Sequence, residues 1–195
     1  MESLLKSTTA QGFTPVQIGI KTLQIRTLVV NWTKVATSLV KERSISRTYT
    51  IKSSYLIDEK LAFGEIAIVQ LLRLDGWNAF WVDTFHKKFW NTMPDEGKPK
   101  QLPSAIRERY DLIKIKNDSK PNGCFDVAAE RSGRVIWLEF KSDKDKNNIN
   151  EGNWINSAMK ADIRETDLFF VGTKPRKNTV INLLDTNGDC HFLNK

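Results

Sequence analysis

The segment GCFDVAAERSGRVIWLEFKSDKD, residues 123–145, decides the fold that we expect for this chain. Short runs of largely apolar residues flank the dipeptide Ser132-Gly133, a pattern that predicts a β-hairpin turning at these two residues. Partner positions in such a hairpin add up to 265, so Asp126 is expected directly opposite Glu139. Directly opposed like charges destabilise a sheet, so this pairing needs a cause.

Alternation divides the second arm of the hairpin into two faces. One face carries Ile136, Leu138 and Phe140, and the other carries Val135, Trp137, Glu139 and Lys141. The predicted pairing places Asp126 on the same surface as Glu139 and Lys141. Three charged groups are therefore expected to converge on a small patch of an otherwise apolar sheet.

Opposed carboxylates are tolerated when a cation lies between them or when one of them holds a proton. Mg²⁺ suits this patch because it prefers oxygen ligands and is commonly held by one or two carboxylates together with a substrate phosphate. Lys141 would orient or help to deprotonate an attacking water and stabilise charge on the phosphate. The patch therefore predicts metal-assisted phosphodiester hydrolysis. The alternative is that Lys141 only neutralises Asp126 and Glu139 on a solvated sheet face.

Elements upstream of the hairpin are predicted from apolar periodicity. Residues 1–58 are expected to form a basic N-terminal helical appendage, with a helix at 18–42 that contacts phosphates or has a solvated basic face. Its apolar stripe contains Ile25, Leu28, Val29, Trp32, Val35, Ala36 and Leu39. A second helix is predicted at 59–76, with Asp58 as its N-cap, and Glu65 lies on its apolar stripe. A carboxylate on that stripe calls for a partner charge, a hydrogen-bond network or a metal.

The region from 78 to 116 is predicted to contain a strand at 78–85, an insert at about 86–108 and an additional strand at 109–116. The insert mixes aromatic side chains with cations, an arrangement that suits binding to a nucleic-acid strand. Phe89 and Trp90 have the alternative role of pinning the insert to the core. The cations expected to contact nucleic acid are Lys87, Lys88, Lys98, Lys100 and Arg107, joined by Lys174, Arg176 and Lys177 of the basic segment 174–177.

The C-terminal part is predicted to contain a helix at 154–165, a strand at 167–173 and a final short pair of strands. Cys124 and Cys190 are interpreted as small buried hydrophobes, because with two histidines the chain lacks a Cys/His cluster at zinc spacing. No apolar run approaches membrane-spanning length and the start of the sequence is polar, so we expect a cytoplasmic protein, or a nuclear one in a eukaryote.

Charge restricts the class of partner. The 195 residues carry a formal net charge of +7 and the sequence pI is about 9.4, which favours a polyanion such as nucleic acid, although an anionic membrane surface would suit the same balance. The chain has no P-loop motif, so any nucleotide-driven motor would be a partner protein.

Taken together, FGE with Glu65, CFD with Asp126 and LEFK with Glu139 and Lys141 resemble the PD-(D/E)XK nuclease superfamily over about residues 59–173. The resemblance implies a restriction-endonuclease-like αβββαβ core, in which a central mixed sheet is flanked by helices. It also implies Mg²⁺ or Mn²⁺ bound by Asp126, Glu139, the Phe140 carbonyl and Glu65, with Lys141 acting on the water. The plan is closest to the VRR-type and Holliday-junction-resolvase-like branches. Phe125 replaces the proline of the superfamily name, and Asn153 and Asn156 stand where VRR-type members tend to carry glutamine.

Residues 59–195 are thus expected to form the nuclease-like domain, acting on DNA with Asp126, Glu139 and Lys141 as catalytic residues. One alternative is a nucleic-acid-binding regulatory module on the same scaffold, without turnover. Another is an RNA endonuclease, for which the ribose 2′-OH would be available as nucleophile. A homodimer is a reasonable expectation because cutting both strands of a duplex commonly needs two sites. The Trp32 stripe would provide the dimer contact or, more simply, would dock onto its own domain.

Overall fold

The computed structural model describes residues 1–18, 21–35, 52–57, 59–142, 149–174 and 181–183. Within these residues, helices alternate with strands along most of the chain. In chain order the elements are α1 (Glu2–Lys6), β1 (Thr8–Ile18), β2 (Lys21–Val30), β3 (Thr33–Lys34), β4 (Ser54–Ile57), β5 (Lys60–Phe63), α3 (Gly64–Leu74), β6 (Asn78–Asp83), β7 (Lys88–Trp90), α4 (Ser104–Lys116), β8 (Val127–Arg131), β9 (Arg134–Lys141), α5 (Ile149–Lys160), a 3₁₀ turn (Glu165–Asp167), β10 (Leu168–Gly172) and β11 (Ile181–Leu183).

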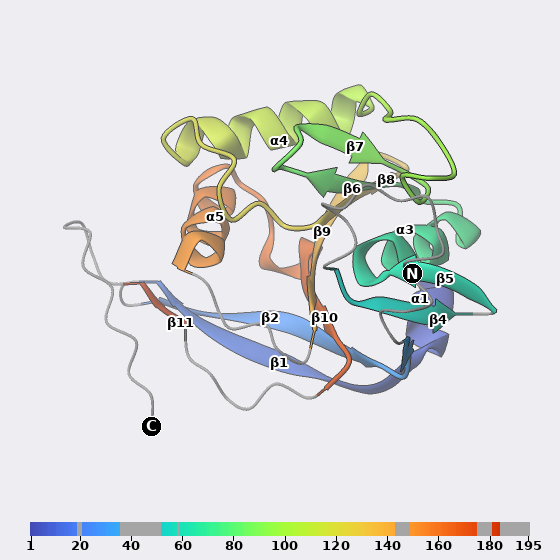
Figure 1. Cartoon of the computed structure of the whole chain (residues 1–195). Helices are drawn as coiled ribbons and strands as arrows, with labels where there is room; N and C mark the ends of the chain where they lie inside the picture. Colours follow the sequence, from blue (N-terminus) through green and yellow to red (C-terminus); the bar gives the residue numbers. More distant parts are fainter. Residues whose placement is uncertain (19–20, 36–51, 58, 143–148, 175–180, 184–195) are drawn as a thin grey trace.

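A mixed sheet forms the centre of the described structure, with strand order β11-β1-β2-β10-β9-β8-β6-β7. β9 is parallel to β10, and β8 is antiparallel to both β9 and β6. Figure 1 shows α1 and α3 on one side of this sheet and α4 and α5 on the other. The expectation of an α/β protein whose central mixed sheet is flanked by helices is therefore confirmed.

Two apolar cores cover the two faces of the sheet, as the alternation along β9 requires. Ile136 and Leu138 belong to the core that contains the buried face of α3. Trp137 belongs to the core that contains the inner sides of α4 and α5, where it packs against Trp154 with ring centroids 6.0 Å apart. Burial of these side chains from water is what fixes the layers against one another.

The hairpin has the predicted register. β8 and β9 pair from Val127 with Leu138 to Arg131 with Arg134, so partner positions add up to 265 throughout. Ser132 and Gly133 form the two-residue turn with φ values of 52° and 79°. Positive φ at both central residues is the geometry of the type I′ turn, whose twist matches that of the strands it joins.

From α3 to β10 the helices and strands run α3, β6, β7, α4, β8, β9, α5 and β10, so the predicted order of helix, three strands, helix and strand is obtained only when β7 and α4 are set aside. β7 and α4 lie between β6 and β8; β7 and the first turn of α4 fall within the predicted insert, and the rest of the insert lies outside helices and strands. The strand predicted at 78–85 is β6, and that predicted at 167–173 is β10. Of the final pair of strands, β11 is described and pairs with β1 in parallel; the residues after Leu183 lie outside the described part.

The predicted helix at 18–42 is wrong over the residues that the structure describes, and residues 36–42 lie outside them. β1 and β2 instead form a long antiparallel pair within the main sheet, so residues 1–35 are not a separate helical appendage. The segment KTLQIRTLVV is rich in β-branched residues, which fit a pleated sheet. Ile25 and Leu28 have helical spacing, but the last four residues of β2 (27–30) are buried on both faces, so its apolar residues do not report a helical stripe.

The additional strand predicted at 109–116 is also wrong, because these residues belong to α4. The buried side chains of α4 are Ile106, Tyr110 and Ile113, which follow the three-to-four-residue spacing of a helix. Leu112 alternates with Tyr110, and Ile115 with Ile113, as in a strand, but Leu112 and Ile115 are both exposed.

Two predicted helices are present with shifted boundaries. The helix predicted at 59–76 begins at Gly64, because residues 60–63 pair with β4 as β5, and its N-cap is Phe63 and not Asp58. The helix predicted at 154–165 runs from Ile149 to Lys160. No helix of the described residues is long and apolar enough to cross a membrane.

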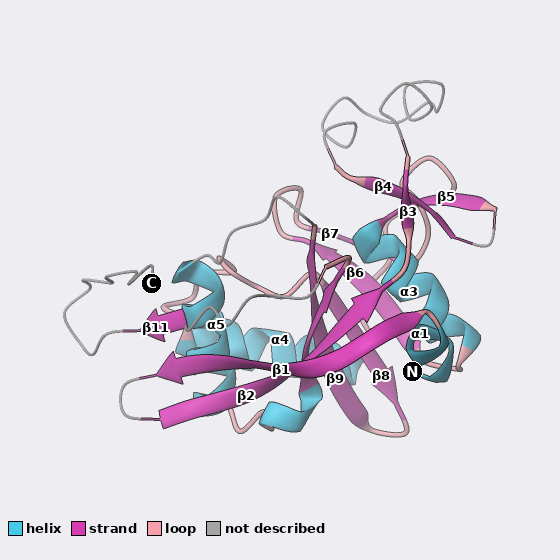
Figure 2. Cartoon of the chain, turned by 90° about the horizontal axis from the view of Figure 1, so that it is seen from below, coloured by secondary structure: helices cyan, strands magenta, loops and turns pink. Residues whose placement is uncertain are grey.

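A small antiparallel sheet of β3, β4 and β5 lies beside α3, away from β11 (Figure 2). Trp32 and Tyr55 from this region pack onto Phe140 at the end of β9, with ring-centroid distances of 5.8 Å and 5.5 Å. Trp32 is buried, so it docks onto its own domain, as the simpler of the two expectations had it. These rings hold Phe140, and hence the backbone between Glu139 and Lys141.

Gly123, in the turn before Asp126, lies directly against the backbone at the start of α5. Its φ is +76°, and a Cβ atom here would lie 1.8 Å from the Asn150 carbonyl oxygen. Gly123→Ala is therefore expected to lower the free energy of unfolding by about 3–5 kcal/mol, since backbone strain and a backbone clash act together. Gly133→Ala is the matched control: φ is +79° but nothing lies within 4 Å of its Cβ, so the loss should be about 1–2 kcal/mol. Urea unfolding measures both losses. Equal decreases in the free energy of unfolding for Gly123→Ala and Gly133→Ala would contradict the close packing at Gly123.

Candidate functional site

Six charged side chains meet where β9 ends and β8 begins, and we call them the charge cluster. Its members are Lys52 before β4, Glu65 in the first turn of α3, Asp126 before β8, Glu139 and Lys141 at the end of β9, and Glu151 in the first turn of α5. Side-chain contacts and charge interactions link all six. The three residues expected on one patch from the hairpin, together with Glu65, therefore do come together.

Asp126 and Glu139 face each other across the continuation of the hairpin ladder. The Asp126 backbone N–H donates to Glu139 Oε2 over 3.1 Å, and the Phe140 backbone N–H donates to Asp126 Oδ2 over 3.0 Å. Each carboxylate thus accepts a hydrogen bond from the opposite strand just beyond the last regular pair, Val127 with Leu138. These bonds fix the orientation of both carboxyl groups and offset part of their mutual repulsion.

Lys141 lies between two carboxylates. Its Nζ is 2.8 Å from Glu139 Oε1 and also donates to Glu151 Oε1. All three side chains are buried. Glu151 Oε2 is buried and has no hydrogen-bond partner among the described residues. A buried carboxylate oxygen without a donor is costly, so a further positive or proton-donating group at this oxygen would be favourable.

Lys52 is the second cation of the charge cluster. Its Nζ donates to Glu65 Oε1 and lies 4.9 Å from the ring centroid of Trp81. Glu65 is buried in the first turn of α3, where the positive end of the helix dipole favours a carboxylate. The predicted need of Glu65 for a partner charge is met by Lys52.

The charge cluster carries excess negative charge. Four carboxylates against two ammonium groups leave two uncompensated negative charges when every group is ionised. Burial, with Glu65 nearby, raises the pKa of Asp126 to about 7. Burial and the facing Asp126 also raise the pKa of Glu139 well above its ordinary value. Both shifts show that the ionised carboxylates are short of positive charge.

Both lysines are held in the charged form. Burial opposes an ammonium at Lys141, but Glu139 and Glu151 raise its pKa above the ordinary value. Burial likewise opposes the charge of Lys52, and Glu65 and Asp126 raise its pKa. Lys141 therefore acts in this arrangement as a cation, and deprotonation of a water would fall to a carboxylate.

The donor set of the charge cluster suits a hard divalent cation. Carboxylate oxygens are the ligands that Mg²⁺ and Mn²⁺ prefer, two negative charges are uncompensated, and Glu151 Oε2 has no donor. Within the described residues, however, no three His, Cys, Asp or Glu side chains already form a grouping that could hold a metal. Lys141 lies between Glu139 and Glu151, so a cation that joined these two acids would require the lysine to move aside.

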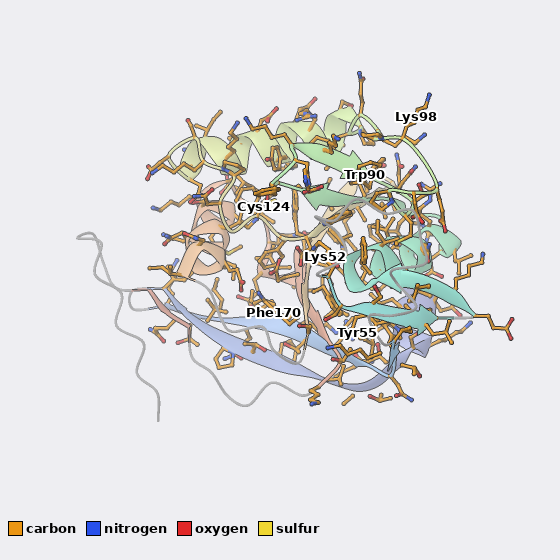
Figure 3. All side chains as sticks on the ribbon, in the orientation of Figure 1. Lys52, Tyr55, Trp90, Lys98, Cys124 and Phe170 are labelled. Carbon is orange, nitrogen blue, oxygen red and sulfur yellow. The ribbon has the colours of Figure 1, made fainter. Side chains whose placement is uncertain are left out.

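The cations predicted to contact nucleic acid lie mainly on other elements. Lys87, Lys88, Lys98 and Lys100 are exposed on the turn after β6, on β7 and on the loop beyond it, and Lys174 is exposed after β10. Figure 3 shows Lys98 at the outer edge of the molecule and Lys52 nearer its middle. Arg107, on α4, is half-buried with its guanidinium 4.9 Å from the Phe89 ring centroid. Arg176 and Lys177 lie outside the described residues.

The aromatic residues of the insert pin it to the core. Trp90 is only 5% exposed and belongs to the core under α3, while Phe89 packs against the other core and forms an edge contact with Tyr110. Neither ring is presented for stacking with a base. Cys124 is half-buried against the second core, close to the predicted burial, and Cys190 lies outside the described residues.

Sequence reasoning missed two members of the charge cluster, Lys52 and Glu151. Glu151 had a usable signal, because Glu151, Trp154, Ile155 and Ala158 have the spacing of a single buried helical stripe. Asn153, which stands where VRR-type members tend to carry glutamine, is exposed. Lys52 had no such signal, since it lies in a polar segment outside any regular element.

Fold and site together define a mixed α/β protein whose central sheet carries a buried charge cluster at the end of one hairpin. Comparisons with protein-family models, with curated proteins and with solved structures gave no match.

Proposed function

We propose that this chain is a metal-dependent nuclease of the PD-(D/E)XK type that hydrolyses phosphodiester bonds in DNA. The observation that carries the proposal is the opposition of Asp126 and Glu139 beside the buried Lys141. The element order α3, β6, β8, β9, α5 and β10 supports it, because this is the order implied by the resemblance of the motifs.

Asp126 and Glu139, with the Phe140 carbonyl and Glu65, are the groups that would hold Mg²⁺ or Mn²⁺. When bound, the cation would supply Lewis-acid stabilisation of the negative charge on the phosphate. The like charges that otherwise destabilise the hairpin then have a purpose, because they provide oxygen ligands for the cation.

The remaining chemistry is assigned to side chains of the charge cluster. Hydrolysis requires a water to lose a proton as its oxygen attacks phosphorus and the bond to the departing oxygen breaks. Lys141, as an ammonium group, can donate to the water oxygen or to a phosphate oxygen and stabilise the growing charge. Glu151 Oε2 lies on the carboxylate that holds Lys141 and is an open acceptor among the described groups, so we assign it to receive the proton of the water.

DNA is proposed as the substrate because a chain with net charge +7 and exposed lysines in the insert favours a polyanion. Within this proposal, Lys87, Lys88, Lys98, Lys100, Arg107 and the segment 174–177 contact the backbone of the strand. A second copy of the chain, cutting the other strand, and partner proteins that supply specificity belong to the same proposal.

The test is incubation of the purified chain with supercoiled plasmid, linear duplex, branched DNA, single-stranded DNA and RNA, each in Mg²⁺, Mn²⁺ or EDTA. We expect cutting of at least one DNA substrate in the divalent ions and none in EDTA. Cutting of RNA alone would replace DNA as the substrate. Salt-dependent binding without cutting of any polymer would contradict the nuclease and favour the binding module.

A further inference from the structure

We propose that Lys52 binds the phosphodiester on which the charge cluster acts, through a direct contact with a non-bridging phosphate oxygen. The inference rests on the proposed function, because it assumes that a nucleic-acid backbone reaches the cluster. No sequence motif marks Lys52, and the geometry alone brings it to the site.

Access distinguishes the two lysines of the cluster. The side chain of Lys52 is 29% exposed, whereas that of Lys141 is 7% exposed. The Lys52 side chain is therefore the more accessible of the two lysines to a phosphate that approaches from solvent. Because the cluster has more carboxylates than lysines, an approaching phosphate is repelled unless an accessible cation receives it.

The ammonium group of Lys52 is held in place by two buried partners. Glu65 accepts a hydrogen bond from it, and the face of Trp81 lies 4.9 Å away. An ammonium has three donors, so Lys52 can hold Glu65 and a phosphate oxygen at once. Since Glu65 belongs to the proposed ligand set, this would place the phosphate next to the carboxylates.

A purely structural role of Lys52 predicts a different effect of its substitution on nucleic-acid binding. If Lys52 only neutralises Glu65, its removal weakens nucleic-acid binding while Glu65 is charged. The same removal has no effect on binding after Glu65→Gln. If Lys52 binds phosphate, its removal weakens nucleic-acid binding in either background. A double-mutant cycle separates these two roles. If Lys52→Gln alone fails to fold because Glu65 is left without a partner, the double variant Lys52→Gln with Glu65→Gln, in which both groups are neutral, can still be compared with Glu65→Gln.

The experiment measures binding of a labelled DNA duplex by fluorescence anisotropy, using the full chain in EDTA at several salt concentrations. Lys52→Gln is expected to weaken binding by about 3- to 10-fold and to reduce the slope of log K against log salt by about one, in the wild-type and in the Glu65→Gln background. Lys52→Arg should retain most of the affinity. Lys60→Gln removes the same charge from an exposed position on β5 and should leave both quantities near those of the wild type.

Two outcomes would overturn the inference: Lys52→Gln behaving like Lys60→Gln, or a loss of affinity that disappears in the Glu65→Gln background. Failure of the nuclease proposal has a different signature, namely a wild-type chain that binds DNA but cuts nothing in Mg²⁺. In that case a Lys52-dependent affinity in both backgrounds would still support the phosphate contact.

Discussion

Lys141→Met is expected to lower the free energy of unfolding by about 3–5 kcal/mol and to abolish cleavage. The stability loss follows because Glu139 and Glu151 are buried on either side of Lys141, and removing one partner of a buried ion pair leaves the others uncompensated. The loss of cleavage follows from removal of the cation assigned to the phosphate charge. Urea unfolding measures the first effect, and nicking of plasmid in Mg²⁺ measures the second.

A compensating variant separates folding from chemistry. Lys141→Met combined with Glu151→Gln restores the net charge of the charge cluster, so we expect recovery of most of the lost stability without recovery of cleavage. Lys160→Met is the matched control, because Lys160 is exposed at the end of the same helix as Glu151 and its loss should change stability by less than about 0.5 kcal/mol. A double variant that cuts DNA would contradict the role of Lys141.

Asp126→Asn is expected to remove cleavage while stabilising the metal-free protein at pH 8. Burial raises the pKa of Asp126 from 3.8 to about 7 in the folded chain, so the folded state binds more protons than the unfolded state between these values. The stability from this proton is fully present below about pH 4 and is lost as pH rises through about 7. Thermal unfolding in EDTA should therefore show the wild type becoming less stable between pH 5 and pH 8, with a shallower decline for Asp126→Asn.

Asparagine at position 126 retains an oxygen that can accept from the Phe140 N–H, so this substitution removes charge with little change in shape. Mg²⁺ should raise the unfolding temperature of the wild type at pH 8 and have little effect on Asp126→Asn. Asp111→Asn, at an exposed position on α4, provides the charge control. A metal-free Asp126→Asn protein that unfolds at a lower temperature than the wild type at pH 8 would show that the opposed carboxylates do not destabilise the metal-free protein.

The hairpin could be predicted to the residue because its signals are local. Both arms are largely apolar, Ser132-Gly133 accepts positive φ, and one register then places every apolar side chain in a core. The opposition of Asp126 and Glu139 follows from that register alone. Glu65 could be predicted as buried because the period of α3 is equally regular.

The N-terminal strands could not be predicted in the same way, because the last four residues of β2 (27–30) are buried on both faces. Its apolar residues include helical and strand spacings at once, and only the partner strands β1 and β10 decide between them. At α4 the opposite error occurs: exposed Leu112 and Ile115 imitate an alternating strand. In both cases tertiary contacts override the local pattern.

The composition of the charge cluster depends on contacts between residues that are distant in the sequence. Lys52 reaches Glu65 across 13 positions and Lys141 reaches Glu151 across 10, with no motif that links either pair. A hairpin register predicts which charges oppose each other within the hairpin. It does not predict which residues from other elements complete the site.

The most direct test of the account is the rate of plasmid nicking by the wild type, Glu139→Gln and Glu108→Gln in Mg²⁺, with each protein shown to be folded. Glu139 is buried in the charge cluster, while Glu108 is exposed on α4, so the two substitutions remove the same charge from different places. We expect Glu108→Gln to nick at the wild-type rate and Glu139→Gln to lose at least about 100-fold. Equal rates for Glu139→Gln and the wild type would contradict the proposal that the opposed carboxylates form a nuclease site.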